Sequence, residues 1–137
     1  MTRVLPLILL VCLAAPASAA DAPKKPQEPG TSVEMPYLIA PLASDDRLVA
    51  YAYISSKILA TSPSAAMDIR EKIPFIQDAF VRDVNGATIG MASDPAKIDS
   101  ANLKARILAD VRRILGAAKV AGIEIVAVQI APLRPGS

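Results

Sequence analysis

The chain has 137 residues, which leaves room for one domain once a targeting segment is set aside. It contains no histidine and no tryptophan, and its 15 basic and 13 acidic residues give a formal net charge of +2 at pH 7. This composition excludes a histidine-based zinc site and the commonest general base, and it is too nearly neutral to indicate a nucleic-acid partner.

The first twenty residues are typical of a secretory signal peptide. Arg3 supplies a positive charge, residues 4–15 are almost wholly apolar, and residues 17–19 read Ala-Ser-Ala, the small-x-small pattern that signal peptidase recognises. The apolar run is about 12 residues long, whereas a helix needs roughly 20 to cross a bilayer. We therefore expect a cleaved signal over residues 1–20. A retained membrane anchor and a lipid-modified Cys12 are the alternatives.

Two proline-rich stretches bound the part of the chain that is expected to fold. Residues 21–33 combine prolines, a glycine and mixed charges, which predicts a solvated linker. Residues 132–137 are predicted to be a flexible tail of similar composition. One compact domain is expected between them, over residues 34–131.

The domain is expected to open with two strands joined as a hairpin. Residues 34–42 have the pattern of an extended strand, and Pro36 and Pro41 restrict it to a sheet edge or a bulge because proline cannot donate to a ladder. Residues 44–46, Ser-Asp-Asp, supply turn chemistry. Residues 47–59 are rich in the side chains that suit a pleated sheet and predict the second strand.

A helix is predicted to start at Ser62 and Pro63, because serine caps helices and proline is tolerated at the first helical position. Apolar side chains then recur at steps of three and four, the spacing of one helix face. They are Ile69, Ile73, Ile76, Phe80 and Val84. Pro74 interrupts the pattern, which predicts two joined helical pieces or one helix bent near residues 70–74. Residues 85–86, Asn-Gly, mark its end.

A second helix is predicted to begin at Asp94 or at Asp99, both of which precede a residue suited to the first turn. Its apolar stripe again has steps of three and four. The stripe consists of Leu103, Ile107, Val111 and Ile114. Arg112 and Arg113 lie in the last turn before Gly116, where positive charge complements the helix dipole.

The last predicted element is a strand that follows Gly122. It reads IEIVAVQIA, an apolar and largely β-branched run with few polar interruptions, which predicts a strand covered on at least one face and central in the sheet. The order strand, strand, helix, helix, strand predicts an α+β fold in two layers, with a small antiparallel sheet packed on two helices.

Three short patterns that resemble reactive or binding motifs have ordinary structural interpretations. Asp45 and Asp46 are expected to form a turn, not an acid/base pair or a calcium site. Ser55 and Lys57 are expected on the polar side of a strand, since nothing nearby supplies an oxyanion hole. Residues 85–90 contain two glycines without the spacing of a phosphate-binding loop. No catalytic, cofactor-binding or metal-binding residue is assigned, and enzymatic activity is not expected.

The candidate interaction surface comprises Tyr51, Tyr53, Arg112 and Arg113. The two tyrosines share one face of the second predicted strand and are expected to be packed. If they are exposed instead, they are good interface anchors, because tyrosine is enriched among residues that dominate binding energy.

The order and wording of these segments resemble the FliL family of flagellar basal-body-associated proteins. Residues 36–42 (PYLIAPL) and 47–51 (RLVAY) resemble the openings of the family's first two strands. Residues 73–80 (IPFIQDAF) resemble a family segment in which proline is followed by isoleucine, a polar residue, Asp-Ala and an apolar residue. Residues 103–115 resemble the second long helix, and residues 126–129 (VAVQ) resemble the closing strand.

The resemblance spans residues 34–131 and implies a stomatin-like domain that forms rings around flagellar stator units and supports motility. It implies self-association and an inner-membrane protein partner at the flagellar basal body, on the periplasmic side. Neither a nucleic-acid partner nor a small-molecule substrate is expected. Members of the family usually have a true transmembrane helix, whereas this sequence has a signal-like segment. The alternative is a soluble periplasmic envelope accessory protein of the same fold without a flagellar role.

Overall fold

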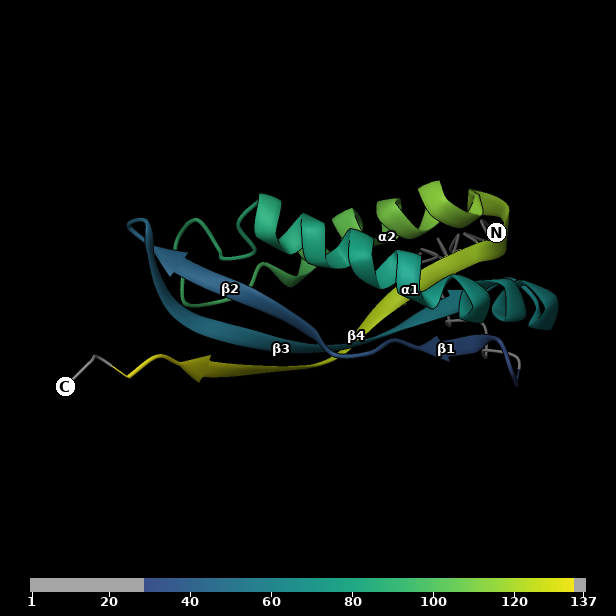
Figure 1. Ribbon diagram of the computed structural model, residues 1–137, viewed down its shortest axis with the longest axis horizontal. Coiled ribbons are helices and arrows are strands. Elements are labelled where there is room, and N and C mark those ends of the chain that lie inside the picture. Colours follow the sequence, from purple (N-terminus) through teal and green to yellow (C-terminus); the bar gives the residue numbers. More distant parts are fainter. Residues whose placement is uncertain (1–28, 135–137) are drawn as a thin grey trace, which may run out of the picture.

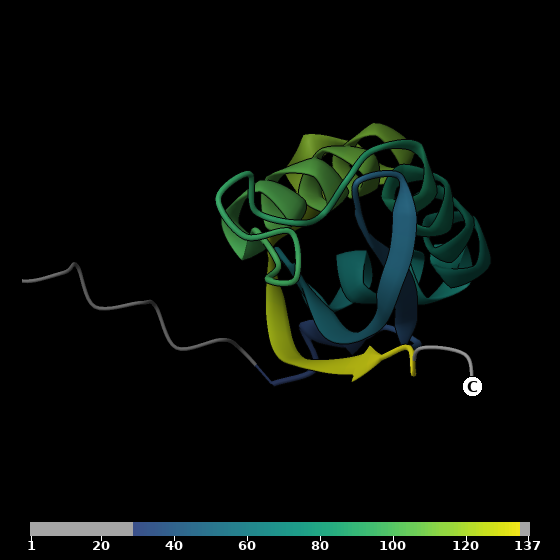
Figure 2. The same ribbon diagram turned by 90° about the vertical axis from the view of Figure 1, so that its left-hand side faces the viewer.

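The computed structural model describes residues 29–134, which form a two-layer α+β fold. The predicted signal peptide, residues 1–20, lies outside the described residues. Both helices lie on the same side of a twisted antiparallel sheet (Figures 1 and 2). The predicted fold class is confirmed, with one additional short strand at the start. The elements are β1 (Ser32–Glu34), β2 (Leu38–Ser44), β3 (Arg47–Ala60), α1 (Pro63–Gly86), α2 (Ser100–Leu115), the 3-10 turn η1 (Ala117–Lys119) and β4 (Val120–Pro132).

The 14-residue strand β3 is the centre of the sheet. β1 and β2 pair with one of its edges, in registers that include Ser32 opposite Leu59 and Leu38 opposite Ile54. β4 pairs along its other edge and with no other strand between residues 29 and 134. The prediction that the closing strand is central is therefore wrong, because the long β3 already separates β4 from the other two strands.

The predicted hairpin turn is confirmed at Asp45 and Asp46. Both residues have positive φ, 50° and 60°, and Ser44 pairs directly with Arg47. A two-residue turn of this kind matches the twist of its flanking strands, and aspartate is among the few residues that adopt positive φ readily. The adjacent carboxylates thus shape the turn.

The expected first strand is divided in two. β1 ends at Glu34 and β2 begins at Leu38, with Pro36 between them. Pro41 lies within β2 on a sheet edge, as the sequence predicted. The predicted linker over residues 21–33 overlaps β1, whose Val33 is buried, so the sheet begins slightly earlier than expected.

Both helices begin at predicted caps. Ser62 Oγ accepts a hydrogen bond from the Ala65 N–H at 3.0 Å, and Asp99 Oδ1 accepts one from the Asn102 N–H at 3.1 Å, so Asp99 and not Asp94 starts α2. α1 is continuous through Pro74, and its ribbon curves in both views of Figures 1 and 2. One curved helix, not two pieces, accommodates the proline.

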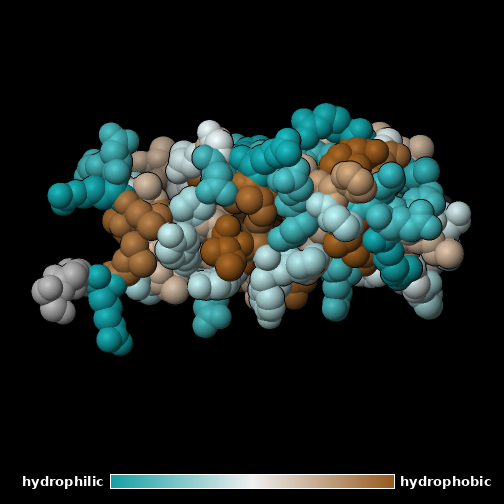
Figure 3. All heavy atoms as spheres, viewed as in Figure 1, coloured by the Kyte–Doolittle hydropathy of each residue, from teal (hydrophilic) through white to brown (hydrophobic). Residues whose placement is uncertain are grey.

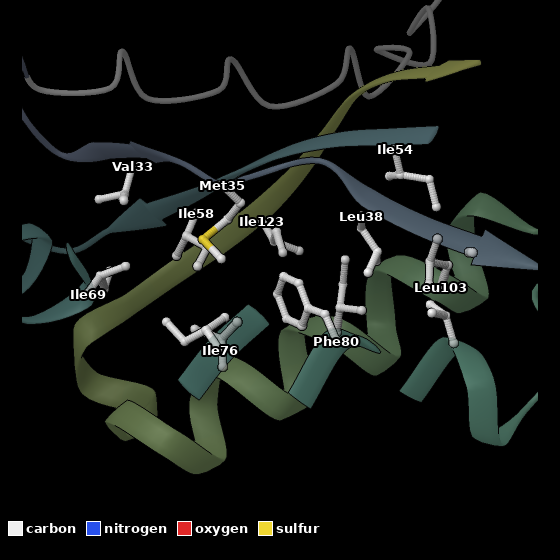
Figure 4. Close-up of a cluster of buried hydrophobic side chains, with 14 of the residues drawn as sticks. Val33, Met35, Leu38, Ile54, Ile58, Ile69, Ile76, Phe80, Leu103 and Ile123 are labelled. Carbon is white, nitrogen blue, oxygen red and sulfur yellow. The ribbon is translucent and has the colours of Figure 1, made fainter. Parts of the chain in front are cut away.

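The apolar stripes of the two helices pack beneath the sheet. Phe80 and Ile76 on α1 point toward the strands, where Figure 4 shows them below Met35, Leu38 and Ile123. α2 contributes the fully buried Leu103, Ile107 and Val111 to the same cluster. One continuous core therefore fills the space between the layers, and no helix within residues 29–134 covers the other face of the sheet.

Candidate interaction surface

The face of the sheet that points away from the helices carries exposed aromatic and aliphatic side chains. Side chains alternate along a strand, and on β3 the even-numbered residues from Ala50 to Ala60 are buried against the helices. Tyr51 and Tyr53 therefore point to the opposite side and are 37 % and 38 % exposed. The expectation that they are packed is wrong, because both helices lie on the other face.

The sheet register places apolar neighbours beside these tyrosines. Tyr53 lies between Ile39 of β2 and Gln129 of β4, and Tyr51 lies between Pro41 and Ala131. Directly opposite residues on neighbouring strands lie close enough for their side chains to touch. Each tyrosine is thus the middle residue of a row that crosses three strands, and apart from Gln129 its neighbours in these rows are apolar.

A small hollow extends this surface toward β1. It is lined by Tyr37 and Val126 together with Glu34 and Ser55, and both Tyr37 and Val126 are exposed. We call the exposed apolar residues on this side of the sheet the open face. The open face consists of Tyr37, Ile39, Tyr51, Tyr53 and Val126.

The second half of β4 is also uncovered. Val128 and Ile130 lie opposite Ile54 and Ala52, so their side chains point to the helix side of the sheet, yet they are 37 % and 40 % exposed. β4 runs away from the helices as it approaches its end (Figures 1 and 2). The prediction that this strand is covered on at least one face is wrong beyond Ile125.

Apolar side chains are also visible at the end of the molecule that holds the β2–β3 turn. In Figure 3 brown spheres lie at the left-hand end among hydrophilic ones, where Figure 1 places this turn and the end of β4. Leu48 and Leu133 are exposed there. The Leu133 N–H donates to the Val49 carbonyl at 2.9 Å, which holds the end of β4 against β3.

Arg112 and Arg113 lie in the last turn of α2, as predicted, and both are exposed. Arg113 Nη2 donates to Asp110 Oδ1 at 2.8 Å. These arginines belong to the helical layer, whereas Tyr51 and Tyr53 lie on the far side of the sheet. The structure therefore does not bring the four predicted residues together, and they form two separate surfaces.

A charged cluster between the helices was not identified from the sequence. The Arg106 guanidinium of α2 donates to the carboxylate and the carbonyl of Asp83 on α1 and to the Thr88 carbonyl. Arg106 and Asp83 are 23 positions apart, so no short-range pattern links them. The pairings of Asp110 with Arg113 at i, i+3 and of Asn102 with Arg106 at i, i+4 are local signals, but such pairs are common on helices.

Asp110 is the buried member of this cluster. It is 8 % exposed, and its buried Oδ2 atom has no hydrogen-bond partner among the residues that the structure describes. Burial raises the pKa of Asp110 above its ordinary value of 3.8, and nearby Asp83 raises it further, while Arg113 and Arg106 oppose the rise. The hollow beside it is lined by Phe75, Asp78, Arg82, Asp83, Asp110 and Arg113.

Lys57, from the Ser55–Lys57 pattern, has an ion-pair partner within the sheet. Lys57 Nζ lies 3.0 Å from Glu124 Oε2, and Ser56 is buried on the helix side. Residues 29–134 contain no group of three or more histidine, cysteine, aspartate or glutamate side chains arranged to hold a metal ion. In the same range, no helix combines the length and the apolar character needed to cross a bilayer.

The sequence matches no protein-family model and no characterised protein with which it was compared.

Proposed function

We propose that this chain is a non-enzymatic, FliL-like interaction protein of the flagellar basal body that supports motility. The observation that carries the proposal is the open face, where tyrosines and aliphatic residues are exposed on the side of the sheet opposite the packed core. Contiguous exposed apolar surface rimmed by polar residues is typical of protein–protein contacts, and tyrosine is prominent among binding anchors. The resemblance of residues 36–42 and 73–80 to FliL supports the flagellar assignment.

In this proposal the partners are further copies of the chain and an inner-membrane protein such as a stator unit. The open face would supply most of the binding energy, since its side chains remove apolar area from water on contact. Arg112 and Arg113, on the other layer, would tune the rate and orientation of association, as exposed rim charges do.

A periplasmic location is part of the proposal, and the signal-like pattern of residues 1–20 supports it. We expect the mature protein to begin at Ala20 or Asp21 and to be recovered in the periplasmic fraction. N-terminal sequencing after cell fractionation measures this directly. An intact N-terminus on a membrane-embedded product would contradict the predicted cleavage.

The double variant Tyr51→Ser/Tyr53→Ser tests the function of the open face. Both side chains are partly exposed, so the variant should fold, while swimming-zone diameter and recruitment to the membrane should fall. Met67→Ser is the matched control, because Met67 is an exposed apolar residue on α1, away from the open face. Circular dichroism on each purified variant checks folding.

The charge-reversal variant Arg112→Glu/Arg113→Glu tests the second surface in the same assays. Loss of motility in this variant alone would assign the contact to the helical layer. If both double variants fold and swim normally, the proposed flagellar interaction is wrong. Intact swimming after clean deletion of the gene would leave the envelope accessory role as the remaining assignment.

A further inference from the structure

The two outer edges of the sheet differ in how they are protected. On β2, Pro41 has no N–H to offer a further strand, and the Tyr37 carbonyl accepts a hydrogen bond from Gln77 Nε2 of α1 at 3.1 Å. Such features block pairing with another chain. On β4, no proline occurs before Pro132, and no side chain from elsewhere in residues 29–134 is hydrogen-bonded to Val128 or Ile130.

The register shows which peptide groups of β4 face outward. The Leu133 N–H donates to the Val49 carbonyl, so Leu133, and with it Ala131 and Gln129 at steps of two, directs its peptide groups toward β3. Alternate residues of an antiparallel strand direct their N–H and C=O groups to opposite sides. The peptide groups of Val128 and Ile130 therefore point away from β3, to the open edge.

Within the described part of the chain no further strand pairs with this edge, and the edge is also uncharged. From Ile125 to Leu133 the sequence is IVAVQIAPL, with no charged residue, whereas natural edge strands commonly carry lysine or another charge. The segment is also nearly symmetric about Gln129. Val128 and Ile130 flank it, and Ala127 and Ala131 lie one step further out.

We propose that β4 binds β4 of a second copy, antiparallel across a two-fold axis that passes through Gln129. This inference rests on the proposed function and names one of its partners. In the paired strands, Val128 of each copy lies opposite Ile130 of the other, and these residues exchange both backbone hydrogen bonds. Ala127 lies opposite Ala131, and the two Gln129 amides meet at the axis, where each can donate to the other.

Two observations favour a second copy over a strand from a different protein. The symmetric sequence pairs apolar with apolar, small with small and amide with amide, and it places no like charges opposite each other. Gln129 is also the register neighbour of Tyr53, so pairing at β4 joins the open faces of both copies into one continuous surface. The ladder ends at Pro132, whose missing N–H faces outward.

Cysteine substitution tests the register. Gln129 directs its peptide groups to β3, so the two Gln129 residues form a non-hydrogen-bonded pair with Cα atoms about 4.5 Å apart. That separation lies within the range of about 4.4–6.8 Å that a disulfide spans. In the full chain on a Cys12→Ser background, Gln129→Cys should form a disulfide-linked dimer on mild oxidation.

The matched control is Ala127→Cys, since the two copies of Ala127 lie four residues apart along the paired strands, roughly 13 Å at the rise of a β-strand. It should remain unlinked alone but form a mixed disulfide with Ala131→Cys. Equal linking of Gln129→Cys and Ala127→Cys would overturn the proposed register and axis.

Sedimentation velocity tests the association itself. The full chain should form a dimer in a concentration-dependent manner, and Ile130→Lys should weaken association by about tenfold or more, because it places charge at an apolar pair of the edge. Val128→Pro removes an outward N–H and should act in the same direction. Circular dichroism and melting temperature distinguish lost pairing from lost folding.

The failures of the two proposals are distinguishable. If the chain stays monomeric at all concentrations and Gln129→Cys does not link, the β4 pairing is wrong even when Tyr51→Ser/Tyr53→Ser impairs swimming. If Ile130→Lys abolishes membrane recruitment of a chain that is monomeric alone, the edge binds a different protein and the second-copy inference is overturned. If Gln129→Cys links but deletion leaves swimming intact, the pairing stands and the flagellar function fails.

Discussion

Phe80 shows how much a single buried side chain contributes to this domain. It is fully buried, and Figure 4 shows its ring pointing from α1 into the cluster beneath the sheet. Phe80→Ala should lower the free energy of unfolding by about 3 to 5 kcal/mol, since it removes buried apolar area and leaves a cavity. Small domains have only about 5 to 15 kcal/mol in total, so the melting temperature should fall sharply.

Phe75 provides the control on the same helix. It is 62 % exposed, so Phe75→Ala should change stability by no more than about 0.5 kcal/mol. Urea denaturation of both variants gives the comparison. Equal losses would mean that the buried face of α1 is assigned incorrectly.

The raised pKa of Asp110 should make the stability of the protein depend on pH. Its pKa is raised in the folded state, chiefly by burial, so the folded protein holds this proton more tightly than the unfolded chain does. Stability therefore falls as pH rises through the unfolded value of 3.8 and then through the raised folded value. Asp110→Asn, which cannot ionise, should gain stability relative to the wild type over that interval and keep the gain at neutral pH.

Thermal unfolding from acid to neutral pH measures this difference. Below the unfolded pKa the Asp110 carboxyl group is protonated in both the folded and the unfolded state. The stability difference between wild type and variant should therefore stop changing with pH. Asp46→Asn, in the exposed hairpin turn, is the matched control. A wild type that becomes more stable relative to Asp110→Asn as pH rises would contradict the assignment.

Among the secondary-structure elements, α1 has an N-cap whose contribution to stability can be measured directly. Ser62→Ala removes the acceptor for the Ala65 N–H and should destabilise the protein by about 0.5 to 2 kcal/mol. Ser64→Ala is the control, because it deletes the same hydroxyl from an exposed site two residues later. Chemical denaturation should separate the two variants, and indistinguishable midpoints would show that the cap contributes nothing.

The sequence predicts local features of the elements and misses those that depend on distant segments. Ser62, Asp99 and the helix stripes were identified because capping and periodicity are set by residues a few positions apart. Pro41 likewise placed its strand at an edge. The edge position of β4 was missed because an apolar run has the same composition whether strands pair with both of its sides or with only one. Its composition also does not depend on whether a helix covers it.

The candidate surface was predicted in composition but not in arrangement. Tyr51 and Tyr53 were correctly placed on one face of a strand, since side-chain alternation is local. Their exposure depends on which side of the sheet receives both helices. The Arg106–Asp83 contact similarly requires the packing of α1 against α2.

The open face and the surface that carries Arg112 and Arg113 lie on opposite layers of the molecule and imply different assemblies. A two-fold contact at β4 uses the same patch on both copies and closes at a dimer. A ring of the kind implied by the FliL resemblance requires a second contact between unlike patches. The helical layer with Arg112 and Arg113 is a separate surface that remains outside the β4 contact.

The unequal edges of the sheet also bear on how this domain avoids aggregation. An exposed, uncharged β-strand is a template on which fibrils grow, because each added strand offers a new edge to the next. In a β4-paired dimer both β4 edges are covered, and the outer edge of each copy is formed by β1 and β2, where Pro41 of β2 and the Gln77–Tyr37 contact interrupt the ladder. In such a dimer, growth of the sheet stops at two copies. The proline at one edge thus prevents the fibril growth that the apolar strand at the other edge would otherwise allow.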